Sequence, residues 1–397
     1  MFETITAASP DAILGVTEAF KQDPRPHKIN LGVGVYKDEH GATPILASVK
    51  AAEAAVLAAA NTKAYLPIAG DPVFRRLVQE MILGADHPAL LANRVRTAHT
   101  PGGTAALRVG ADLLKKACPR ATVWLSHPTW ANHRGIFSAA GFAVREYAYY
   151  NHAAQSLDFE GLRTALRAVP PGDIVLLHAC CHNPTGVDLT AAQWAELAAI
   201  AAGGAWMPFV DFAYQGYGHG LEEDRLGVLA LAQACPEMII ASSLSKNFGL
   251  YQDRTGALTL MAAGAAAADA AFSNLEIAIR VNYSNPPAHG GLIVTRILTD
   301  PDLRRQWRGE LDAMRAHITD ARQRFVAALR AHGVPGNFSF IARQMGMFSY
   351  SGLGAVPVQF LREQKGIYMV GDGRINVAGI NAANLDYLCQ SIAEALS

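Results

Sequence analysis

Short apolar runs alternate with helical stretches through much of the chain, from about residue 94 onward. The runs expected to form buried strands are residues 121–125, 173–177, 207–210 and 238–241. The helices expected between them are residues 161–168, 191–202 and 226–234. Strand and helix in alternation predict βαβ units, and hence an α/β fold with a mostly parallel sheet covered by helices.

The pattern changes after Pro301, where a long helical segment rich in arginine and alanine covers residues 302–331. The beginning of the chain also lacks the alternation of strand and helix. We therefore expect a large domain over residues 46–310 and a smaller α+β domain formed by residues 1–45 together with 311–397. The helix 302–331 is expected to link the two domains.

The charge balance argues against a polyanionic partner. The 397 residues include 34 Lys and Arg against 34 Asp and Glu, whereas nucleic-acid binding draws on an excess of basic charge. The most apolar tract, residues 255–268, is shorter than the ~18 residues that a membrane span needs. The N-terminus has no basic segment typical of a signal peptide, and the five cysteines are an odd, sparse set. These features favour a cytoplasmic protein without a membrane or nucleic-acid partner.

Candidate reactive side chains follow the predicted strands, where ligands bind in open α/β sheets. Asp211 ends the run 207–210, and Tyr214 comes three residues later. Burying a carboxylate is costly unless it meets a cation, and a protonated pyridine nitrogen would serve, with Tyr214 donating to a phenolate oxygen of the same ring. An aspartate that caps a helix, followed by a core tyrosine, fits these residues equally well.

Two glycine- and serine-rich turns are candidates for binding a phosphate and supplying an amine. Residues 100–104 (TPGGT) run into a helical stretch, whose free N–H groups suit an anion, although such a turn can also be plain geometry. In residues 242–249 (SSLSKNFG), Lys246 at a strand end is a candidate nucleophilic amine. Ser243 and Arg254 are polar groups suited to a phosphate.

A third loop and two arginines complete the candidates. Asn183 follows the run 173–177 and can donate to a ring oxygen. The neighbouring side chains of His178, Cys180, Cys181 and His182 lack the paired spacing of zinc sites, so no metal is expected. Arg374 and Arg280 are candidates for bidentate carboxylate recognition, and the alternative for each is a surface salt bridge.

Taken together, these motifs resemble the fold-type I, pyridoxal-phosphate-dependent aminotransferases, in the branch that acts on aspartate and aromatic amino acids. The resemblance covers nearly the whole chain, from residue 30 to residue 379. The motifs that carry it are residues 101–104 (PGGT), 181–186 (CHNPTG), 211–216 (DFAYQG), 245–251 (SKNFGLY) and 284–287 (SNPP). It implies a seven-stranded, mostly parallel sheet in the large domain and pyridoxal phosphate as cofactor.

The resemblance also implies a role for each site residue. The catalytic residues are Lys246, Asp211 and Tyr214, and Lys246 is the residue that bonds to the cofactor and moves the substrate proton. The implied cofactor-binding residues are Lys246, Gly103, Thr104, Trp130, Asn183, Asp211, Tyr214, Ser243, Arg254 and Tyr65. The implied substrate-binding residues are Gly34, Trp130, Asn183, Arg280 and Arg374. His133 and His178 stand behind Asp211.

A homodimer is implied as well, because Tyr65 and Arg280 reach the partner subunit's site in such enzymes. Arg374 would bind the α-carboxylate and Arg280 the side-chain carboxylate of aspartate, glutamate or 2-oxoglutarate. The implied reaction is ping-pong transfer of an amino group between amino acids and 2-oxo acids. The bonds before Pro128 and Pro184 match positions that are often cis.

The sequence indicates the amino-acid substrate less clearly than it indicates the type of reaction. Residues similar to those of aspartate enzymes are Val35, Lys37, Thr43, Thr104 and Asn285, whereas Ala64 and residues 65–68 (YLPI) are more like aromatic-type enzymes. We therefore expect an aspartate aminotransferase with some acceptance of aromatic amino acids. The alternatives are an enzyme whose main substrates are tyrosine and phenylalanine, a different reaction on the same cofactor such as β-decarboxylation, and a non-catalytic regulator.

Overall fold

The chain forms two compact units in the computed structural model, which describes residues 1–7 and 14–397. The larger unit is Pro44–Ala316, and the smaller unit combines Met1–Thr43 with His317–Ser397. The unit boundaries therefore follow residues 43 and 316, whereas the sequence pattern predicts boundaries after residues 45 and 310. The long helix expected from the sequence is α12 (Pro301–Ala331), and the second boundary falls within it.

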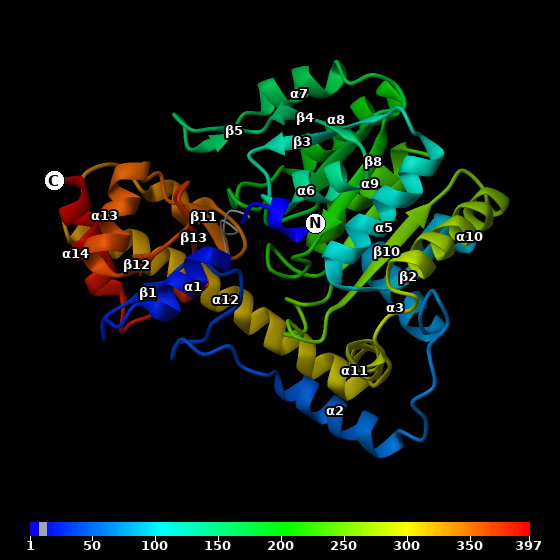
Figure 1. The fold of residues 1–397 in the computed structure, drawn as a ribbon, viewed down its shortest axis with the longest axis horizontal. Helices are drawn as coiled ribbons and strands as arrows, with labels where there is room; N and C mark the ends of the chain where they lie inside the picture. Colours follow the sequence, from blue (N-terminus) through cyan, green and yellow to red (C-terminus); the bar gives the residue numbers. More distant parts are fainter. Residues whose placement is uncertain (8–13) are drawn as a thin grey trace. The chain divides into compact units, whose positions relative to one another are not determined.

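A seven-stranded sheet runs through the larger unit (Figure 1). Its strands lie in the order β2-β10-β9-β8-β7-β3-β4. Their bounds are β2 (Val95–Pro101), β3 (Thr122–His127), β4 (Ala143–Ala148), β7 (Ile174–His178), β8 (Met207–Phe212), β9 (Met238–Ser243) and β10 (Thr255–Met261). Only β10 runs antiparallel to its neighbours. The four predicted strands are β3, β7, β8 and β9, so the predicted parallel sheet is confirmed.

Helices cover this sheet in two layers. In one layer α5 (Gly102–Ala117) packs on β10, β9 and β2, with α10 (Ala265–Asn282) and α6 (Asn132–Ala139) beside it. In the other, α3 (Pro72–Leu83) packs on β2 and contacts α9. The three helices predicted between strands are α7 (Phe159–Arg167), α8 (Ala191–Gly204) and α9 (Leu226–Ala234). They pack side by side, with α7 next to β4.

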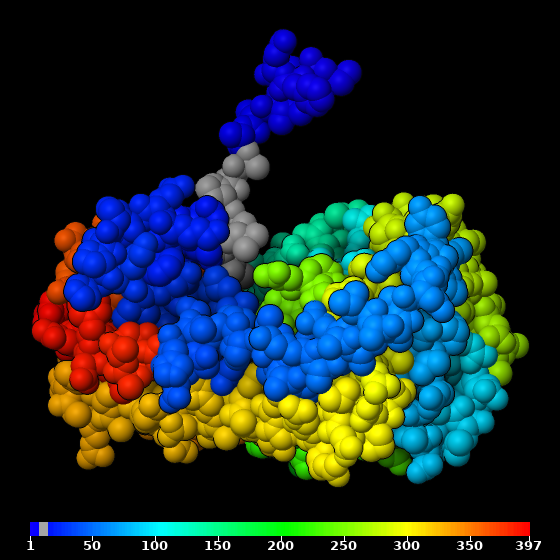
Figure 2. All heavy atoms as spheres, turned by 90° about the horizontal axis from the view of Figure 1, so that it is seen from below, coloured from blue at the N-terminus to red at the C-terminus, as the bar shows by residue number. Residues whose placement is uncertain are grey.

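Two further helices of the larger unit lie against each other, α2 (Ala47–Ala59) and α11 (Ala288–Thr299), and Figure 2 shows their blue and yellow surfaces adjoining. The N-terminus of α2 is held by α12, because the Glu310 carboxylate accepts hydrogen bonds from the backbone N–H groups of Ala47 and Ser48. The remaining short elements of this unit are α4 (Pro88–Leu91), β5 (Tyr150–Asn151), β6 (Ser156–Leu157) and η2 (Glu223–Arg225).

The main apolar core of the larger unit lies between the sheet and α5. Leu107 and Leu114 of α5 are almost fully buried against Phe209 of β8 and Leu258 of β10. Phe137 of α6 meets Phe209 edge to face, with ring centroids 5.5 Å apart. Because helices cover both faces of the sheet, the strands can be apolar throughout, as the sequence pattern predicts for covered parallel strands.

The smaller unit is built from short paired strands and peripheral helices. Strand β1 (Ile29–Asn30) pairs in parallel with β12 (Ile367–Tyr368), and β11 (Phe348–Tyr350) pairs antiparallel with β13 (Arg374–Asn376). Its other elements are η1 (Phe2–Thr4), α1 (Leu14–Gln22), η3 (Ser339–Arg343), α13 (Ala355–Lys365), η4 (Val377–Gly379) and α14 (Leu385–Leu396). Across the described residues of both units, none of the helices is long and apolar enough to cross a membrane.

One histidine of β2 is buried without hydrogen-bond partners for its ring among the described residues. His99 is 1% exposed, and neither ring nitrogen has a hydrogen-bond partner among the described residues. The ring lies 4.3 Å from the ring of Phe74, centroid to centroid. Burial lowers the pKa of His99 from 6.5 to about 4, against a smaller opposing effect of Asp71. His99 is therefore neutral in the folded protein at pH 5, whereas in the unfolded chain it is protonated.

This burial predicts a pH-dependent stability. Between pH 6.5 and pH 4 the unfolded chain binds more protons at His99 than the folded chain does, so stability is lost as the pH falls through that window. Replacing His99 with Gln removes this loss. From pH 8 to pH 5, the free energy of unfolding of His99→Gln relative to wild type should therefore rise by about 2 kcal/mol.

Urea unfolding of the cofactor-free protein at the two pH values checks this change. His40→Gln is the matched control, because the side chain of His40 is 81% exposed and its replacement should give no comparable rise. An equal effect of the two substitutions would contradict the role assigned to burial.

Candidate active site

The candidate residues of the larger unit gather where parallel strands end. Strands β7, β8 and β9 are adjacent and parallel, so their carboxyl ends lie at one edge of the sheet. Asp211 is paired with His178 in the register of β8 and β7, and Lys246 follows β9 by three residues. Asn183 lies in the loop after β7. The fold therefore brings together side chains that are far apart in the sequence, as the sequence pattern predicts.

The antiparallel strand β10 brings an arginine to the same edge. In its register with β2, Thr255 is opposite Pro101, so Arg254 lies beside the turn that begins α5. A Cβ atom added at Gly102 would come within 2.5 Å of the Arg254 guanidinium, which only glycine permits. The same guanidinium donates to the Ser245 hydroxyl at 3.2 Å.

The start of α5 is suited to an anion. The residue before the helix, Pro101, has no side chain that caps it. Thr104 lies in the first turn, and Gly103 packs against Ser243, since an added Cβ would be 3.1 Å from the Ser243 Cβ. Free backbone N–H groups, a hydroxyl group and the adjacent guanidinium of Arg254 together form the donor set that a phosphate group requires.

Asp211 is held by a chain of hydrogen bonds behind it. His133 Nε2 lies 2.9 Å from Asp211 Oδ2, and His133 Nδ1 lies 2.8 Å from the Thr129 hydroxyl oxygen. The same oxygen lies 3.2 Å from His178 Nε2. The backbone N–H of Asn183 donates to His178 Nδ1 at 3.4 Å. The family resemblance places His133 and His178 behind Asp211. His133 is bonded to it directly, and His178 is linked to it through Thr129 and His133.

The direction of donation along this series of hydrogen bonds follows from its first donor, the backbone N–H of Asn183. Because His178 Nδ1 accepts from Asn183, and burial lowers the pKa of His178 to about 3, its one proton is on Nε2 and is donated to Thr129. The Thr129 hydroxyl then donates to His133 Nδ1, and His133 Nε2–H donates to Asp211. Burial alone raises the pKa of Asp211, but the hydrogen bond donated by His133, together with smaller electrostatic contributions that include the positive charge of Lys246, outweighs it and keeps the carboxylate ionised.

Lys246 has the properties of a nucleophilic amine. Its pKa is lowered from 10.5 to about 8, because the effect of burial, to which the charge of Arg254 adds, exceeds the opposing effect of the Asp211 carboxylate. Its Nζ atom lies 5.0 Å from the centroid of the Tyr214 ring. A substantial fraction of this amine is therefore neutral at physiological pH, as nucleophilic attack on a carbonyl carbon requires.

Two aromatic residues that the sequence analysis missed fix the backbone around Lys246. The Tyr217 hydroxyl donates to the Lys246 carbonyl oxygen at 3.0 Å. The Trp307 indole donates to the Asn247 carbonyl oxygen at 2.8 Å and stacks on Phe248, with centroids 4.3 Å apart. One feature of the sequence could have pointed to these contacts: Trp307 is the only tryptophan in the arginine-rich segment 302–331.

A further buried histidine, His182, joins the loops that carry Asn183 and Trp130. His182 is fully buried, with Nδ1 2.8 Å from the Thr185 hydroxyl and Nε2 3.0 Å from the Ser126 hydroxyl. The bonds before Pro128 and Pro184 are both cis, as the resemblance implied. Trp130 lies edge-on to His133, with centroids 5.2 Å apart.

The neighbouring cysteines do not make a convincing metal site. The ligand atoms of Cys180, Cys181 and Asp224 lie within 4.8 Å of one another. However, the Asp224 carboxylate accepts hydrogen bonds from the backbone N–H groups of four residues, Gly216, Gly218, His219 and Gly220. This carboxylate therefore serves to hold a loop.

Tyr65 and Arg280 are exposed on the larger unit. Tyr65 is 92% exposed, and Arg280 lies near the end of α10, where it donates to the Ser284 hydroxyl. In the described part of the chain, neither has a hydrogen bond or ion pair to the residues around Lys246. The structure of the single chain thus leaves both side chains outside the cluster.

Arg374 and Gly34 belong to the smaller unit. Arg374 is 3% exposed, and its guanidinium donates to the Gly32 carbonyl oxygen at 2.8 Å. The same group lies 4.4 Å from the centroid of the Phe348 ring. An added Cβ at Gly34 would be 2.7 Å from this ring. Arg374 is therefore a buried, oriented cation, unlike the surface arginine that was the alternative interpretation.

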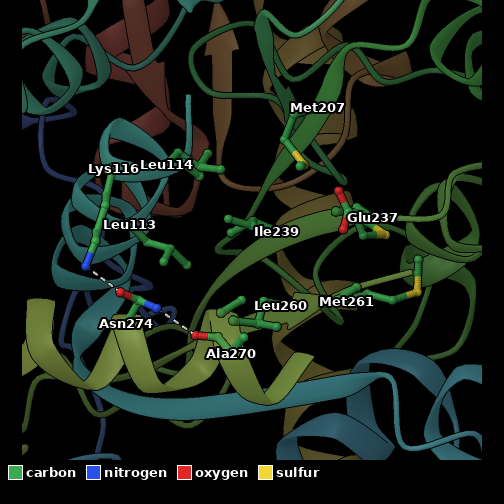
Figure 3. A pocket seen from close by; sticks show the side chains of 14 residues that line it. Leu113, Leu114, Lys116, Met207, Glu237, Ile239, Leu260, Met261, Ala270 and Asn274 are labelled. Atoms are coloured by element: carbon green, nitrogen blue, oxygen red, sulfur yellow. Dashed lines mark hydrogen bonds between the residues drawn. The ribbon is translucent and has the colours of Figure 1, made fainter. Parts of the chain in front are cut away.

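A cavity of about 370 Å³ lies at the other end of the sheet (Figure 3). It is lined by the first residues of β8 and β9, including Met207 and Met238, and by apolar side chains of α5 such as Leu113. Its polar rim includes Lys116 and Asn274, which hydrogen-bond to each other. Since Asp211 and Lys246 lie at the opposite ends of β8 and β9, this cavity is separate from the candidate active site.

The Asp211 carboxylate, the partly neutral amine of Lys246 and the anion-binding start of α5 fit a phosphorylated aldehyde cofactor with a basic ring nitrogen. Comparison with known proteins identifies the family. The chain belongs to the aminotransferase class I and II family, whose model matches residues 26–392. It is 52% identical to an aspartate aminotransferase of Salmonella typhi over 396 residues, which span 100% of both chains.

Two further similarities concern aromatic-amino-acid aminotransferases. The chain is 44% identical to an aromatic-amino-acid aminotransferase of Pseudomonas aeruginosa, over 99% of this chain and 98% of the relative. It is 46% identical to that of Burkholderia pseudomallei, whose solved structure, covalently bound to pyridoxal phosphate, superposes with a TM-score of 0.97 over 100% of both chains.

The environment of Lys246 predicts an amine that titrates near pH 8. The rate of acylation of Lys246 in the cofactor-free protein, followed by peptide mass spectrometry, should have its midpoint there. Arg254→Gln should move the midpoint up, because a nearby positive charge is lost, and Asp211→Asn should move it down, because a negative charge is lost. Exposed Lys50, measured in the same digest, should be unaffected. Shifts in the opposite directions would contradict the assigned electrostatics.

Proposed function

We propose that the protein is a pyridoxal-phosphate-dependent aspartate aminotransferase, which transfers an amino group between L-aspartate and 2-oxoglutarate and accepts some aromatic amino acids. The observation that carries the proposal is the meeting of Lys246, Asp211 and the anion-binding start of α5 at one edge of the sheet. The 52% identity to an aspartate aminotransferase over the whole chain supports the choice of substrate.

The donor set fits the cofactor at both of its ends. Gly103, Thr104, Ser243 and Arg254 would hold the phosphate group, and Asp211 would hold the proton on the ring nitrogen. In support, the Asp211 carboxylate is kept ionised by His133, so that it attracts a cationic nitrogen. When bound, pyridoxal phosphate supplies an aldehyde that takes up amino groups and a protonated ring that accepts the electron pair released at the substrate Cα.

The remaining side chains of this edge would orient the ring and move the proton. Tyr214 and Asn183 would donate hydrogen bonds to the phenolic oxygen of the ring, and Trp130 would stack on its face. Lys246, displaced by the substrate amino group, would take the proton from Cα and deliver it to the aldehyde carbon of the cofactor. In the second half of the reaction it would carry a proton from that carbon back to Cα of the second substrate. Its lowered pKa supports this role, because a neutral amine is the form that accepts a proton.

Two arginines would recognise the substrate. We assign the α-carboxylate to Arg374 with Gly34 beside it, and the side-chain carboxylate to Arg280 of the partner subunit. The exposure of Tyr65 and Arg280 in a single chain supports a homodimer, in which both reach the partner's site. The five cysteines, all free thiols, are consistent with the cytoplasmic location that we propose.

An aromatic-amino-acid aminotransferase is the second candidate function. It is favoured by the 44% identity to such an enzyme and by Ala64, a small apolar residue next to Tyr65. Both candidates need a dicarboxylate as one substrate, so Arg280 is compatible with either.

Side-by-side kinetics decide between the two. With 2-oxoglutarate as acceptor, kcat/KM should be higher for aspartate than for tyrosine and phenylalanine, and turnover of the aromatic substrates should be measurable. Arg280→Ala should reduce kcat/KM for aspartate by about a hundredfold and change it little for phenylalanine, because only aspartate loses a charge partner. Equal losses for both substrates would argue against the assignment of Arg280.

The covalent role of Lys246 has a separate test. Lys246→Ala should retain part of the affinity for pyridoxal phosphate, through the phosphate-binding groups and Asp211, but should lose the absorbance of the lysine-bound cofactor and essentially all turnover. Retained turnover would exclude Lys246 as the proton carrier.

A shared site predicts complementation between two inactive variants. Mixed dimers of Lys246→Ala and Arg280→Ala contain one site with an intact Lys246 and an intact Arg280 of the partner subunit. After unfolding and refolding of an equimolar mixture, aspartate turnover should return to about a quarter of the wild-type value, because half of the dimers are mixed and each has one complete site. Separately refolded variants are the control, and failure of the mixture to exceed them would contradict the shared site.

A further inference from the structure

Arg322 of α12 is a buried arginine of the smaller unit, 2% exposed, and it lies outside the set of residues that the proposed reaction uses. Its guanidinium donates to backbone carbonyl oxygens of the segment before and within β11. These acceptors are the carbonyl oxygens of Ile341 (3.0 Å), Met345 (3.2 Å), Gly346 (2.7 Å) and Phe348 (2.5 Å), and the Ser349 hydroxyl oxygen (2.5 Å).

These five acceptors around one buried cation attach residues 341–349 firmly to α12. An arginine keeps its charge in any environment, and a buried charge is costly unless its hydrogen bonds are made. The planar fork of Arg322 meets this demand by binding a single stretch of chain, residues 341–349, at several points. Removing the fork leaves these carbonyl groups without their donor, so β11 loses its attachment to α12.

Strand β11 in turn supports Arg374. In the antiparallel register, Tyr350 is opposite Arg374 and Phe348 is opposite Asn376. The Phe348 ring lies against the Arg374 guanidinium, with 4.4 Å from Cζ to the ring centroid, and this cation–π contact orients the charged group. The carbonyl oxygen of the same Phe348 is one of the acceptors of Arg322. One residue thus connects this buried attachment to the arginine assigned to the α-carboxylate.

We propose that Arg322 is a positioning residue for the α-carboxylate site, which acts by fixing Phe348 and, through its ring, the guanidinium of Arg374. The inference rests on the proposed function insofar as Arg374 binds the substrate carboxylate. It assigns Arg322 no contact with substrate or cofactor.

The position of this attachment predicts its kinetic signature. Every amino acid and every 2-oxo acid substrate carries the α-carboxylate. A less firmly oriented Arg374 should therefore weaken the binding of all these substrates to a similar extent. A change at Arg280 should differ, because it should weaken the binding only of substrates with a second carboxylate. The groups around Lys246 belong to the larger unit, so the absorbance of the bound cofactor and its pH dependence should stay as in wild type.

The test compares Arg322→Lys and Arg322→Met with wild type as holoenzymes. Lysine keeps the charge but has no fork, and methionine removes the charge and fills similar space. In both variants KM for aspartate, phenylalanine and 2-oxoglutarate should rise together by about tenfold, with kcat changed much less. The affinity for succinate, an unreactive dicarboxylate, should fall by a similar factor.

Two control variants on the same helix separate positioning from general damage. Arg324→Lys alters a surface arginine two residues away, which pairs with Asp320 at 2.6 Å, and should leave KM unchanged. Leu329→Ala removes buried side-chain volume from α12 in the same unit, because Leu329 is 1% exposed, and should lower the melting temperature without raising KM. A rise of KM in Leu329→Ala that matches that of Arg322→Lys would overturn the proposal.

A double-mutant cycle tests the route through Phe348. If Arg322 acts through the Phe348 ring, then Arg322→Lys should raise KM little further in a Phe348→Leu background. Additive effects, or an unchanged KM in Arg322→Lys, would overturn the inference. If wild type fails to transaminate, the proposed function fails, and the succinate affinities of wild type and Arg322→Lys still decide whether Arg322 positions a carboxylate site.

Discussion

The hydrogen bond from His133 to Asp211 is the interaction on which the candidate site depends. A carboxylate at the end of a covered strand would take up a proton or destabilise the fold if it had no donor. His133 supplies the donor, and Thr129 and His178 fix which ring nitrogen of His133 carries the proton. The charge of Asp211 is thereby maintained where a cationic ring nitrogen can be bound, and it limits how far the pKa of the nearby Lys246 falls.

The second constraint is the direction of one strand. With β10 antiparallel, the chain leaves β9, forms the loop that carries Lys246, and re-enters the sheet at Thr255 beside the end of β2. Arg254 thus reaches the glycine turn at the start of α5. If β10 were parallel, its first residue would lie at the opposite edge, and the cation would be separated from the helix N-terminus. The donors that we propose for the phosphate and the amine of Lys246 therefore share one edge because of a single change in strand direction.

Much of this arrangement could be predicted from the sequence, and the part that could not has physical reasons. Strands β3, β7, β8 and β9 are apolar runs because both faces of the sheet are covered, and polar residues at their ends were readable as a site. Strand β10 was not singled out, since its alanine-rich continuation blurs the boundary with α10. Tyr217, Trp307 and Arg322 act through backbone carbonyl groups of distant residues, and no spacing rule records such contacts.

The two arginines assigned to the substrate differ in a way that bears on its range. Arg374 is buried, bonded to a carbonyl oxygen and stacked on Phe348, so its direction is fixed. Arg280 stands at the exposed end of α10 in the single chain and donates to the Ser284 hydroxyl, so its direction is less constrained by its own chain. A rigid group suits the α-carboxylate, which is common to all substrates. A movable one suits the side chain, which alternates between a carboxylate in one half of the reaction and, for aromatic amino acids, a ring in the other.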